Sequence, residues 1–235
     1  LVRELHIRAA EIDFDCVTTI YIGGGTPSVL TLAQMHKLMQ GLREKVNFAN
    51  VSEVTIEVNP DDVTEDYILG LKALGVNRVS MGVQSFVDAE LKAVNRRHNA
   101  AEAITAVEAI RRAGIANVSI DLIYGLPGQT IESWRHSLDT LLTQGVEHVS
   151  AYNLSYEEGT ALTRLRDMGR ITEVDEDTCV EMYEMLCSRL AEAGYEHYEI
   201  SNFALPGMYS CHNSNYWNGT PYLGLGAAAH SFDGV

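Results

Sequence analysis

Residues 78–85 read RVSMGVQS and residues 117–125 read NVSIDLIYG, and the chain between these two runs has the apolar spacing of helices over 87–95 and 100–113. Short runs rich in Val, Ile and other apolar residues are typical of buried parallel strands. Two such strands joined by a helical connection form a right-handed β-α-β unit. The rest of the fold can be extended from this unit in both directions.

Three further runs of the same kind flank this unit. They are TTIYIGG at 18–24, EVTIEVN at 53–59 and HVSAYNLS at 148–155. Segments with helical spacing accompany them at 31–46, 64–74 and 130–144. The order predicts an α/β fold with a parallel sheet, either open and doubly wound or curled into a full or partial (β/α) barrel. In each of these architectures, ligands bind at the carboxyl ends of the strands.

The two ends of the chain depart from this alternation. Residues 1–11 have the spacing of the second half of an amphipathic helix and begin with Leu1, so we expect a truncation in front. A predicted helix at 174–193 and a predicted strand in YEHYEISNFA (195–204) precede a loop-rich tail that ends without a terminating element. We therefore expect a missing C-terminal portion and two parts, a barrel over 1–172 and the start of a C-terminal region over 173–235.

The composition limits the classes of partner. With 17 Lys and Arg against 32 Asp and Glu, the formal net charge of −15 repels nucleic acid and anionic membrane surfaces. No stretch approaches the roughly 20 apolar residues of a transmembrane helix. The four cysteines are few and widely spaced, which is typical of a reducing cytoplasm. We expect a cytoplasmic protein that has no transmembrane segment and binds no nucleic acid.

A glycine run closes the first visible strand. Gly23, Gly24 and Gly25, followed by Thr26 and Pro27, permit positive φ and let backbone groups approach a ligand closely. A plain strand-to-helix turn is the alternative. The run matches neither the dinucleotide-binding pattern G-x-G-x-x-G nor a P-loop with Lys, so the common phosphate sites are not predicted.

Charged and amide side chains stand at the ends of the next three strands, as Glu57, Gln84 and Asp121. Any one alone is explained by a cap on the following loop, but three in succession favour a polar ligand with hydroxyl and amino groups. Arg96 and Arg97 follow a short predicted helix. The guanidinium of one of them could clamp a carboxylate, or both could form surface salt bridges.

Five motifs in order along the chain give the sequence a specific resemblance. They are GGGTP at 23–27, EVNP at 57–60, MGVQSF at 81–86, NRRH at 95–98 and DLIYGLPGQT at 121–130. The chain resembles the radical S-adenosylmethionine (SAM) proteins of the oxygen-independent coproporphyrinogen III dehydrogenase family. The resemblance implies a partial (β/α)6 TIM-like barrel, here lacking its first strand, with SAM bound at its C-terminal rim.

The same resemblance implies the residues that hold SAM. Gly24, Gly25 and Thr26 match positions at its methionine end. Further SAM contacts are implied for Glu57, Gln84, Arg96 and Asp121. The match leaves two places for Arg96, beside the carboxylate of SAM or near its ribose. Hydrogen-bond acceptors, an arginine and close backbone suit the amino group, carboxylate and sulfonium of this ligand.

The sequence departs from that family at the iron–sulfur cluster. The family carries Cys-x3-Cys-x2-Cys after the first barrel strand, where three thiolates hold a [4Fe–4S] cluster. This chain has no such spacing, and we interpret Cys16, Cys179 and Cys187 as core or surface thiols. We therefore expect no metal ligand in the chain itself and place the cluster in the full-length protein, on a segment upstream of Leu1.

The tail indicates a branch of the family. CHNSNYWNG at 211–219 and GLGAAAHSF at 224–232 resemble the haem chaperones of the HemW type. This resemblance implies His212 as the haem contact, because a neutral imidazole flanked by aromatic residues suits both axial ligation and stacking. A structural role within an aromatic loop is the alternative. Cys211 and His230 rank below His212 as haem ligands.

Two functions follow from the resemblance. One is a haem chaperone that uses SAM and the cluster and delivers haem to respiratory proteins. The other is the dehydrogenase, in which a 5′-deoxyadenosyl radical starts the oxidative decarboxylation of coproporphyrinogen III to protoporphyrinogen IX. Few basic residues beyond Arg96 and Arg97 are available for propionates, which favours the chaperone. An unrelated phosphate-binding barrel is disfavoured because no basic residue accompanies the glycine run.

Overall fold

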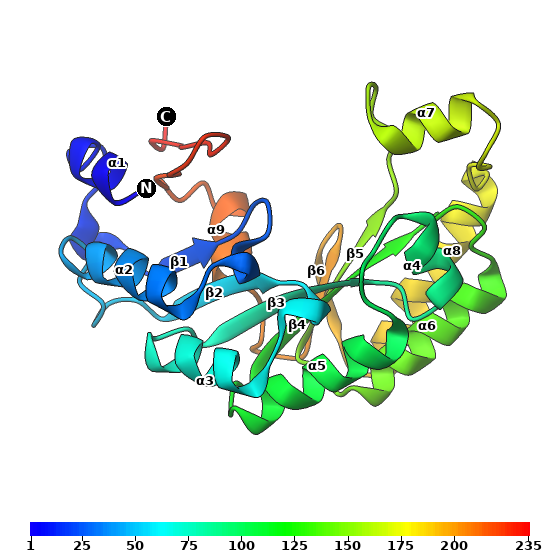
Figure 1. Ribbon diagram of the computed structural model, residues 1–235, viewed down its shortest axis with the longest axis horizontal. Helices are drawn as coiled ribbons and strands as arrows, with labels where there is room; N and C mark the ends of the chain where they lie inside the picture. Colours follow the sequence, from blue (N-terminus) through cyan, green and yellow to red (C-terminus); the bar gives the residue numbers. More distant parts are fainter.

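The computed structural model describes residues 1–235 and contains one curved seven-stranded sheet, with the strand order β1-β2-β3-β4-β5-β7-β6 (Figure 1). The strands are β1 (Thr19–Ile22), β2 (Glu53–Val58), β3 (Arg78–Gln84), β4 (Asn117–Tyr124), β5 (His148–Asn153), β6 (Glu196–Glu199) and β7 (Asn202–Ala204). Strands β1 to β5 are parallel to one another, β7 is antiparallel to β5, and β6 is antiparallel to β7. The predicted parallel sheet is confirmed.

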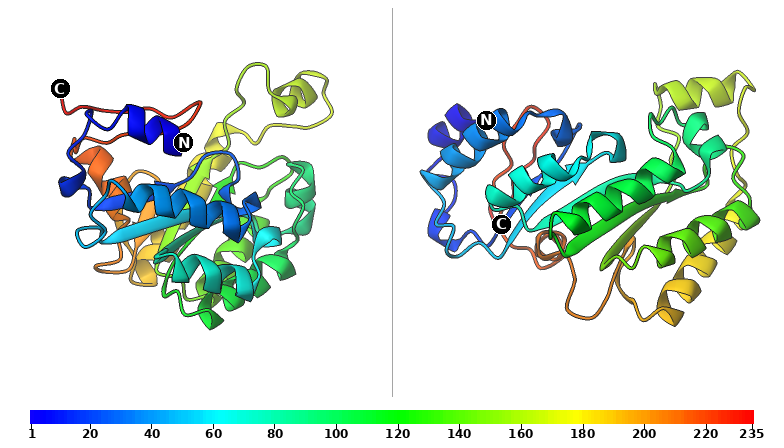
Figure 2. Two further views of the ribbon diagram at one scale, coloured as in Figure 1. Left: turned by 60° about the vertical axis from the view of Figure 1, so that its left-hand side comes forward. Right: turned by 60° about the horizontal axis from the view of Figure 1, so that its bottom comes forward.

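Helices connect the parallel strands along one side of the sheet (Figures 1 and 2). The longer ones are α2 (Leu32–Arg43), α3 (Glu65–Ala73), α5 (Ala100–Arg112), α6 (Ile131–Thr143) and α8 (Glu176–Glu192). The shorter ones are α1 (Val2–Ile7), α4 (Asp88–Ala93), α7 (Ala161–Asp167) and α9 (Cys211–Trp217), with 3-10 turns at Phe14–Cys16, Pro27–Val29 and Pro60–Asp62. The curled sheet with helices outside is a half-barrel, which selects the partial barrel among the predicted architectures.

Local capping fixes where the connecting helices begin. The side chains of Thr31, Asn99 and Thr130 each accept a hydrogen bond from the backbone N–H of the residue three positions later. The side chain of that later residue in turn accepts the backbone N–H of the capping residue. Such a capping box satisfies two otherwise unpaired groups at a helix start. The predicted helical segments at 31–46, 100–113 and 130–144 therefore begin at the first residues after these caps.

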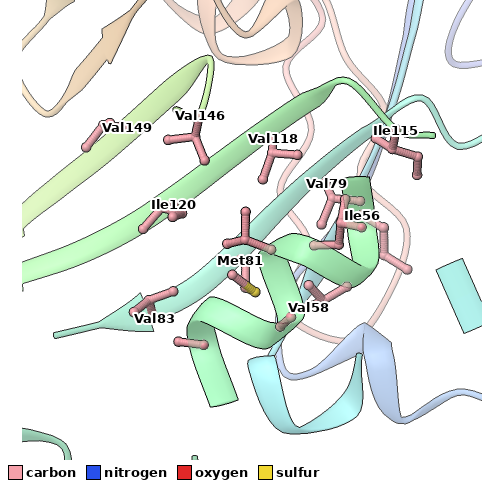
Figure 3. Close-up of a cluster of buried hydrophobic side chains, with 14 of the residues drawn as sticks. Ile56, Val58, Val79, Met81, Val83, Ile115, Val118, Ile120, Val146 and Val149 are labelled. Atoms are coloured by element: carbon pink, nitrogen blue, oxygen red, sulfur yellow. The ribbon is translucent and has the colours of Figure 1, made fainter. Parts of the chain in front are cut away.

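The residues of each parallel strand alternate between two environments. On β3, Val79, Met81 and Val83 are fully buried in the apolar layer beneath the helices (Figure 3). The intervening Ser80 and Gly82 line a cleft on the opposite, concave face. Successive strand residues point to opposite sides of a sheet, so one face forms the core and the other is free for a site. Strand β3 is thus apolar on its outer face only.

The segment after α8 differs from the sequence prediction in two places. The strand expected over 195–204 is a hairpin, in which β6 and β7 flank the turn at Ile200 and Ser201. Residues 211–217, expected to be loop, form helix α9. Its start is satisfied by Ser210, which accepts the N–H of Asn213, and by the Glu53 carboxylate. Because Glu53 is remote in sequence, no local pattern indicated this helix.

The two ends of the chain lie side by side (Figure 1). Glu4 Oε2 accepts the Gly226 N–H at 3.0 Å, and Arg8 Nη1 donates to the Gly224 carbonyl at 2.7 Å. The tail is therefore anchored against α1. None of the helices is both long and apolar enough to cross a lipid bilayer.

Candidate functional site

The concave face of the sheet holds a polar cleft of about 400 Å³. Seven of the eight predicted contact residues line it, namely Gly25, Thr26, Glu57, Gln84, Arg96, Asp121 and His212. The eighth, Gly24, lies beside them and donates its N–H to Glu57. The half-barrel thus brings together side chains from strands β2, β3 and β4 and from α9 with residues of the loops that follow β1 and α4.

Glu57 holds the glycine run in place at one side of the cleft. Its Oε1 accepts the Tyr21 hydroxyl at 2.7 Å, and its Oε2 accepts the Gly24 N–H at 3.0 Å. Burial raises the pKa of Tyr21, so this hydroxyl stays a donor. A Cβ on Gly23 would lie 2.3 Å from the Tyr21 ring, and Gly24 and Gly25 have φ of 76° and 69°. Only glycine fits this turn without strain.

Arg96 crosses the end of β3. Its Nη2 donates to the Gly82 carbonyl at 2.6 Å and to Asn59 Oδ1 at 2.9 Å. The β3–β4 register shifts between Gly82 and Gln84, and Gln84 has a φ of 70°. This bulge turns the end of the strand toward the cleft. Desolvation lowers the pKa of Arg96 from a value far above neutrality, so the group remains a cation.

Asp121 lies in the middle of the cleft. Ser80 Oγ donates to its two carboxylate oxygens at 3.1 and 3.2 Å. Burial raises the pKa of Asp121 to about 6, and hydrogen bonds from serine side chains and the charge of Arg78 act in the opposite direction. Its charge therefore changes close to neutral pH, unlike that of an ordinary exposed carboxylate.

A second row of polar residues, not predicted from the sequence, forms the deeper part of the cleft. Arg78 and His148 are 2% and 1% exposed and begin their strands. His148 Nδ1 is 2.8 Å from Ser119 Oγ, and its Nε2 is 2.8 Å from the Tyr198 hydroxyl. Burial lowers the pKa of His148 well below its usual value, so the imidazole is neutral. This row follows from the period-two alternation of R-V-S-M-G and H-V-S-A-Y, which the sequence does contain.

His212 joins α9 to the first strand. Its ring stacks on Tyr21, with centroids 4.9 Å apart and planes at 16°. Its Nδ1 is 2.9 Å from Thr19 Oγ1, and its Nε2 is 3.0 Å from the Tyr216 hydroxyl. Both ring nitrogens therefore have hydrogen-bond partners. Desolvation lowers the pKa of His212, which keeps it neutral at physiological pH.

Three other residues considered from the sequence lie away from this arrangement. Arg97 is outside the cleft, with 62% of its side chain exposed and an ion pair to Asp61 at 2.6 Å. His230 and Cys211 are both exposed, and Cys211 lines a different hollow. Of the two neighbouring arginines, only Arg96 faces the cleft.

Comparison with known proteins places the chain in a family. Residues 2–141 match the family model described as the radical SAM superfamily. The chain is 42% identical over 217 residues to the heme chaperone HemW of Bacillus subtilis, with 92% of this chain and 57% of that protein covered. It is 40% identical over 220 residues to HemW of Lactococcus lactis, covering 94% and 58%. The chain thus spans little more than half the length of these curated relatives.

A solved structure shares the fold. Coproporphyrinogen III oxidase (HemN) of Escherichia coli, described as a radical SAM enzyme, superposes with a TM-score of 0.83 at 28% identity, covering 99% of this chain and 56% of HemN. The half-barrel therefore has a known architecture. Since the family model covers more than half of its residues, the chain belongs to the radical SAM superfamily.

Proposed function

We propose that this chain forms the SAM-binding half-barrel of a cytoplasmic haem chaperone of the HemW type, which binds haem and delivers it to respiratory proteins. The observation that carries the proposal is the gathering of the predicted contact residues in one cleft of a chain about 40% identical to proteins named heme chaperone HemW. The division into a barrel over 1–172 and a C-terminal region over 173–235 is likewise a proposal. In it, the β6–β7 hairpin extends the barrel sheet from the second part.

The residues of the cleft fit SAM. The space above Gly24 and Gly25 is open, since no atom lies within 4 Å of a Cβ built on either residue. In the proposal, this backbone and Thr26 meet the methionine end, while Glu57, Gln84, Arg96 and Asp121 supply acceptors, an amide and a cation. Bound SAM would supply a sulfonium whose carbon–sulfur bond can be cleaved. These side chains orient the ligand and surround it with protein.

The cysteines of this chain do not fit a [4Fe–4S] cluster. Cys16 and Cys211 are exposed at separate places, and Cys179 and Cys187 lie on α8. No three His, Cys, Asp or Glu side chains gather in a group that could hold a metal ion. The superfamily uses such a cluster with SAM, and in this proposal the cluster ligands belong to the full-length gene product and not to the half-barrel described here.

Haem ligation by His212 would require the loss of one of its side-chain hydrogen bonds. Both of its ring nitrogens are hydrogen-bonded, so a bond to iron needs Nε2 to leave the Tyr216 hydroxyl or Nδ1 to leave Thr19. The exposed Trp217, at 61%, and Tyr216, at 48%, lie on the same helix and offer ring surface to a porphyrin. Release of the Tyr216 bond frees the nitrogen that points along the helix.

The alternative function is the oxidative decarboxylation of coproporphyrinogen III. The superposition on coproporphyrinogen III oxidase over nearly the whole chain favours it, because the same half-barrel serves that enzyme. A shared fold alone does not assign an activity, however. The two functions differ in the state of the tetrapyrrole, which a chaperone returns unchanged and an enzyme converts.

The test is a haem titration followed by Soret absorbance, on the full-length gene product with its cluster reconstituted. Stoichiometric haem binding, weakened in His212→Ala and kept in the control His230→Ala, supports the chaperone. An anaerobic assay for decarboxylated product runs in parallel with coproporphyrinogen III as substrate. Turnover without stable haem binding would replace the proposal with the alternative.

A further inference from the structure

A buried cation in the cleft has no partner. Arg78 is 2% exposed, its Nε is buried without a hydrogen-bond partner, and its side chain lines the cleft. No carboxylate forms an ion pair with it, although the guanidinium carries five N–H donors. Buried guanidinium groups are normally paired with an anion, because removing the charge from water is unfavourable unless a counter-charge compensates.

Acidic residues on the strands that flank β3 are engaged elsewhere. The Asp121 carboxylate accepts the hydroxyl of Ser80. The Glu53 carboxylate accepts the backbone N–H groups of Cys211 and His212 at 2.9 and 3.0 Å, and so caps α9. Neither acid forms a hydrogen bond or an ion pair with the guanidinium, although the charge of Arg78 lowers the pKa of Asp121 at longer range. The fork of Arg78 remains available to an acceptor that enters the cleft.

The position of Arg78 is distinct from that of Arg96. Arg96 binds the carbonyl of Gly82, which follows Arg78 by four residues on β3. At the rise of a strand, the two levels are about 13 Å apart. Ser150 and Asn202, from β5 and β7, line the same cleft and add hydroxyl and amide groups. The cleft thus holds two guanidinium groups at different depths, of which the deeper one has no protein acceptor.

We propose that Arg78 is the centre of a carboxylate-binding subsite in the deep part of the cleft. The inference rests on the proposed function, since that function supplies two ligands with carboxylates. One source is the methionine carboxylate of SAM, and the other is a propionate of the tetrapyrrole. In either case, a bidentate contact with the guanidinium fork supplies the missing counter-charge.

The experiment compares each ligand with its carboxylate-free form. SAM is compared with decarboxylated SAM by calorimetry, and haem is compared with haem dimethyl ester by Soret titration, using the full-length gene product. The variants are Arg78→Gln and Arg78→Lys, and Arg97→Gln is the control because it removes an exposed arginine outside the cleft. Circular dichroism confirms that each variant is folded.

We expect Arg78→Gln to weaken the binding of one of the two carboxylate ligands about ten-fold or more, as for a lost charged hydrogen bond. The affinity for the carboxylate-free form of that ligand should not change. Weaker binding of SAM assigns the subsite to the carboxylate of SAM, and weaker binding of haem assigns it to a propionate. Arg78→Lys keeps the charge but loses the fork, so it should retain part of the affinity. If the Gln variant does not fold, the Lys variant carries the same comparison.

Two results would overturn the inference. Equal weakening of a ligand and of its carboxylate-free form would show that Arg78 only supports the cleft, and unchanged affinity for both SAM and haem would show that it binds neither. Failure of the proposed function looks different, because the unsubstituted protein would then bind no haem at all. Arg97→Gln should match the unsubstituted protein in every titration.

Discussion

Replacing Asp121 with Asn should stabilise the protein at neutral and alkaline pH. Burial raises the pKa of Asp121 from 3.8 to about 6, so the folded state binds this proton more tightly than the unfolded state. At 1.36 kcal/mol per pKa unit, ionisation of the buried carboxyl costs at most about 3 kcal/mol of folding free energy. Because the pKa of this acid is higher in the folded state, its contribution to stability is fully present below pH 3.8 and is lost as the pH rises through 6.

The pH dependence is the sharper measurement. Between pH 5.5 and 8, a range that lies above the isoelectric point of about 4.8, this group should remove about 0.8 kcal/mol of stability from the unsubstituted protein. Urea unfolding can be followed by the fluorescence of Trp134, which is fully buried. Asp121→Asn should lose this part of the slope, and the exposed control Asp233→Asn should keep it. An unchanged slope in Asp121→Asn would refute a desolvated carboxyl at this position.

Three further substitutions test contacts around the cleft. Gly23→Ala places a Cβ against the Tyr21 ring, so it should lower the unfolding free energy by about 1–3 kcal/mol and weaken the binding of SAM. A stable variant with normal affinity for SAM would contradict this geometry. Tyr198→Phe removes the hydroxyl at His148 Nε2 and should cost about 1–3 kcal/mol in urea unfolding; no loss would mean that the buried nitrogen has another partner. Glu53→Gln removes the charged acceptor for the start of α9 and should lower the midpoint of thermal unfolding, which would stay unchanged if that helix were capped by Ser210 alone.

The parallel strands and their helices could be predicted because local patterns determine them. The run at 78–85 became β3 at Arg78–Gln84, and the segment at 100–113 became α5 at Ala100–Arg112, behind its Asn99 cap. Helix α9 could not be predicted in this way. Its first two backbone N–H groups donate to the Glu53 carboxylate, which lies 158 and 159 residues earlier in the sequence. A contact of that range leaves no mark in the local sequence.

The sequence predicted residues at the rim of the cleft but not those in its deeper part. Polar residues at the ends of strands, such as Glu57 and Gln84, were predicted as ligand contacts because ligands bind at strand ends, and they line the cleft. Arg78 and His148 are the first residues of their strands, and the rule about strand ends does not apply to such positions. The alternation of polar and apolar residues along β3 and β5 did contain the information, but the runs were interpreted only as buried strands. In this half-barrel the inner face is mostly polar where it lines the cleft.

Net charge proved a poor guide to the interior of this cleft. The formal charge of −15 and the few basic residues near the predicted rim favoured a chaperone over an enzyme that must hold propionates. The cleft nevertheless contains two guanidinium groups, from Arg78 and Arg96, and Arg97 is not one of them. Net charge governs long-range steering and solubility, whereas recognition of a carboxylate depends on one or two cations at defined positions. The distinction between the two proposed functions therefore rests on the 40% identity to a HemW protein and on whether a tetrapyrrole is returned unchanged or converted in the assay, and no longer on the scarcity of basic residues.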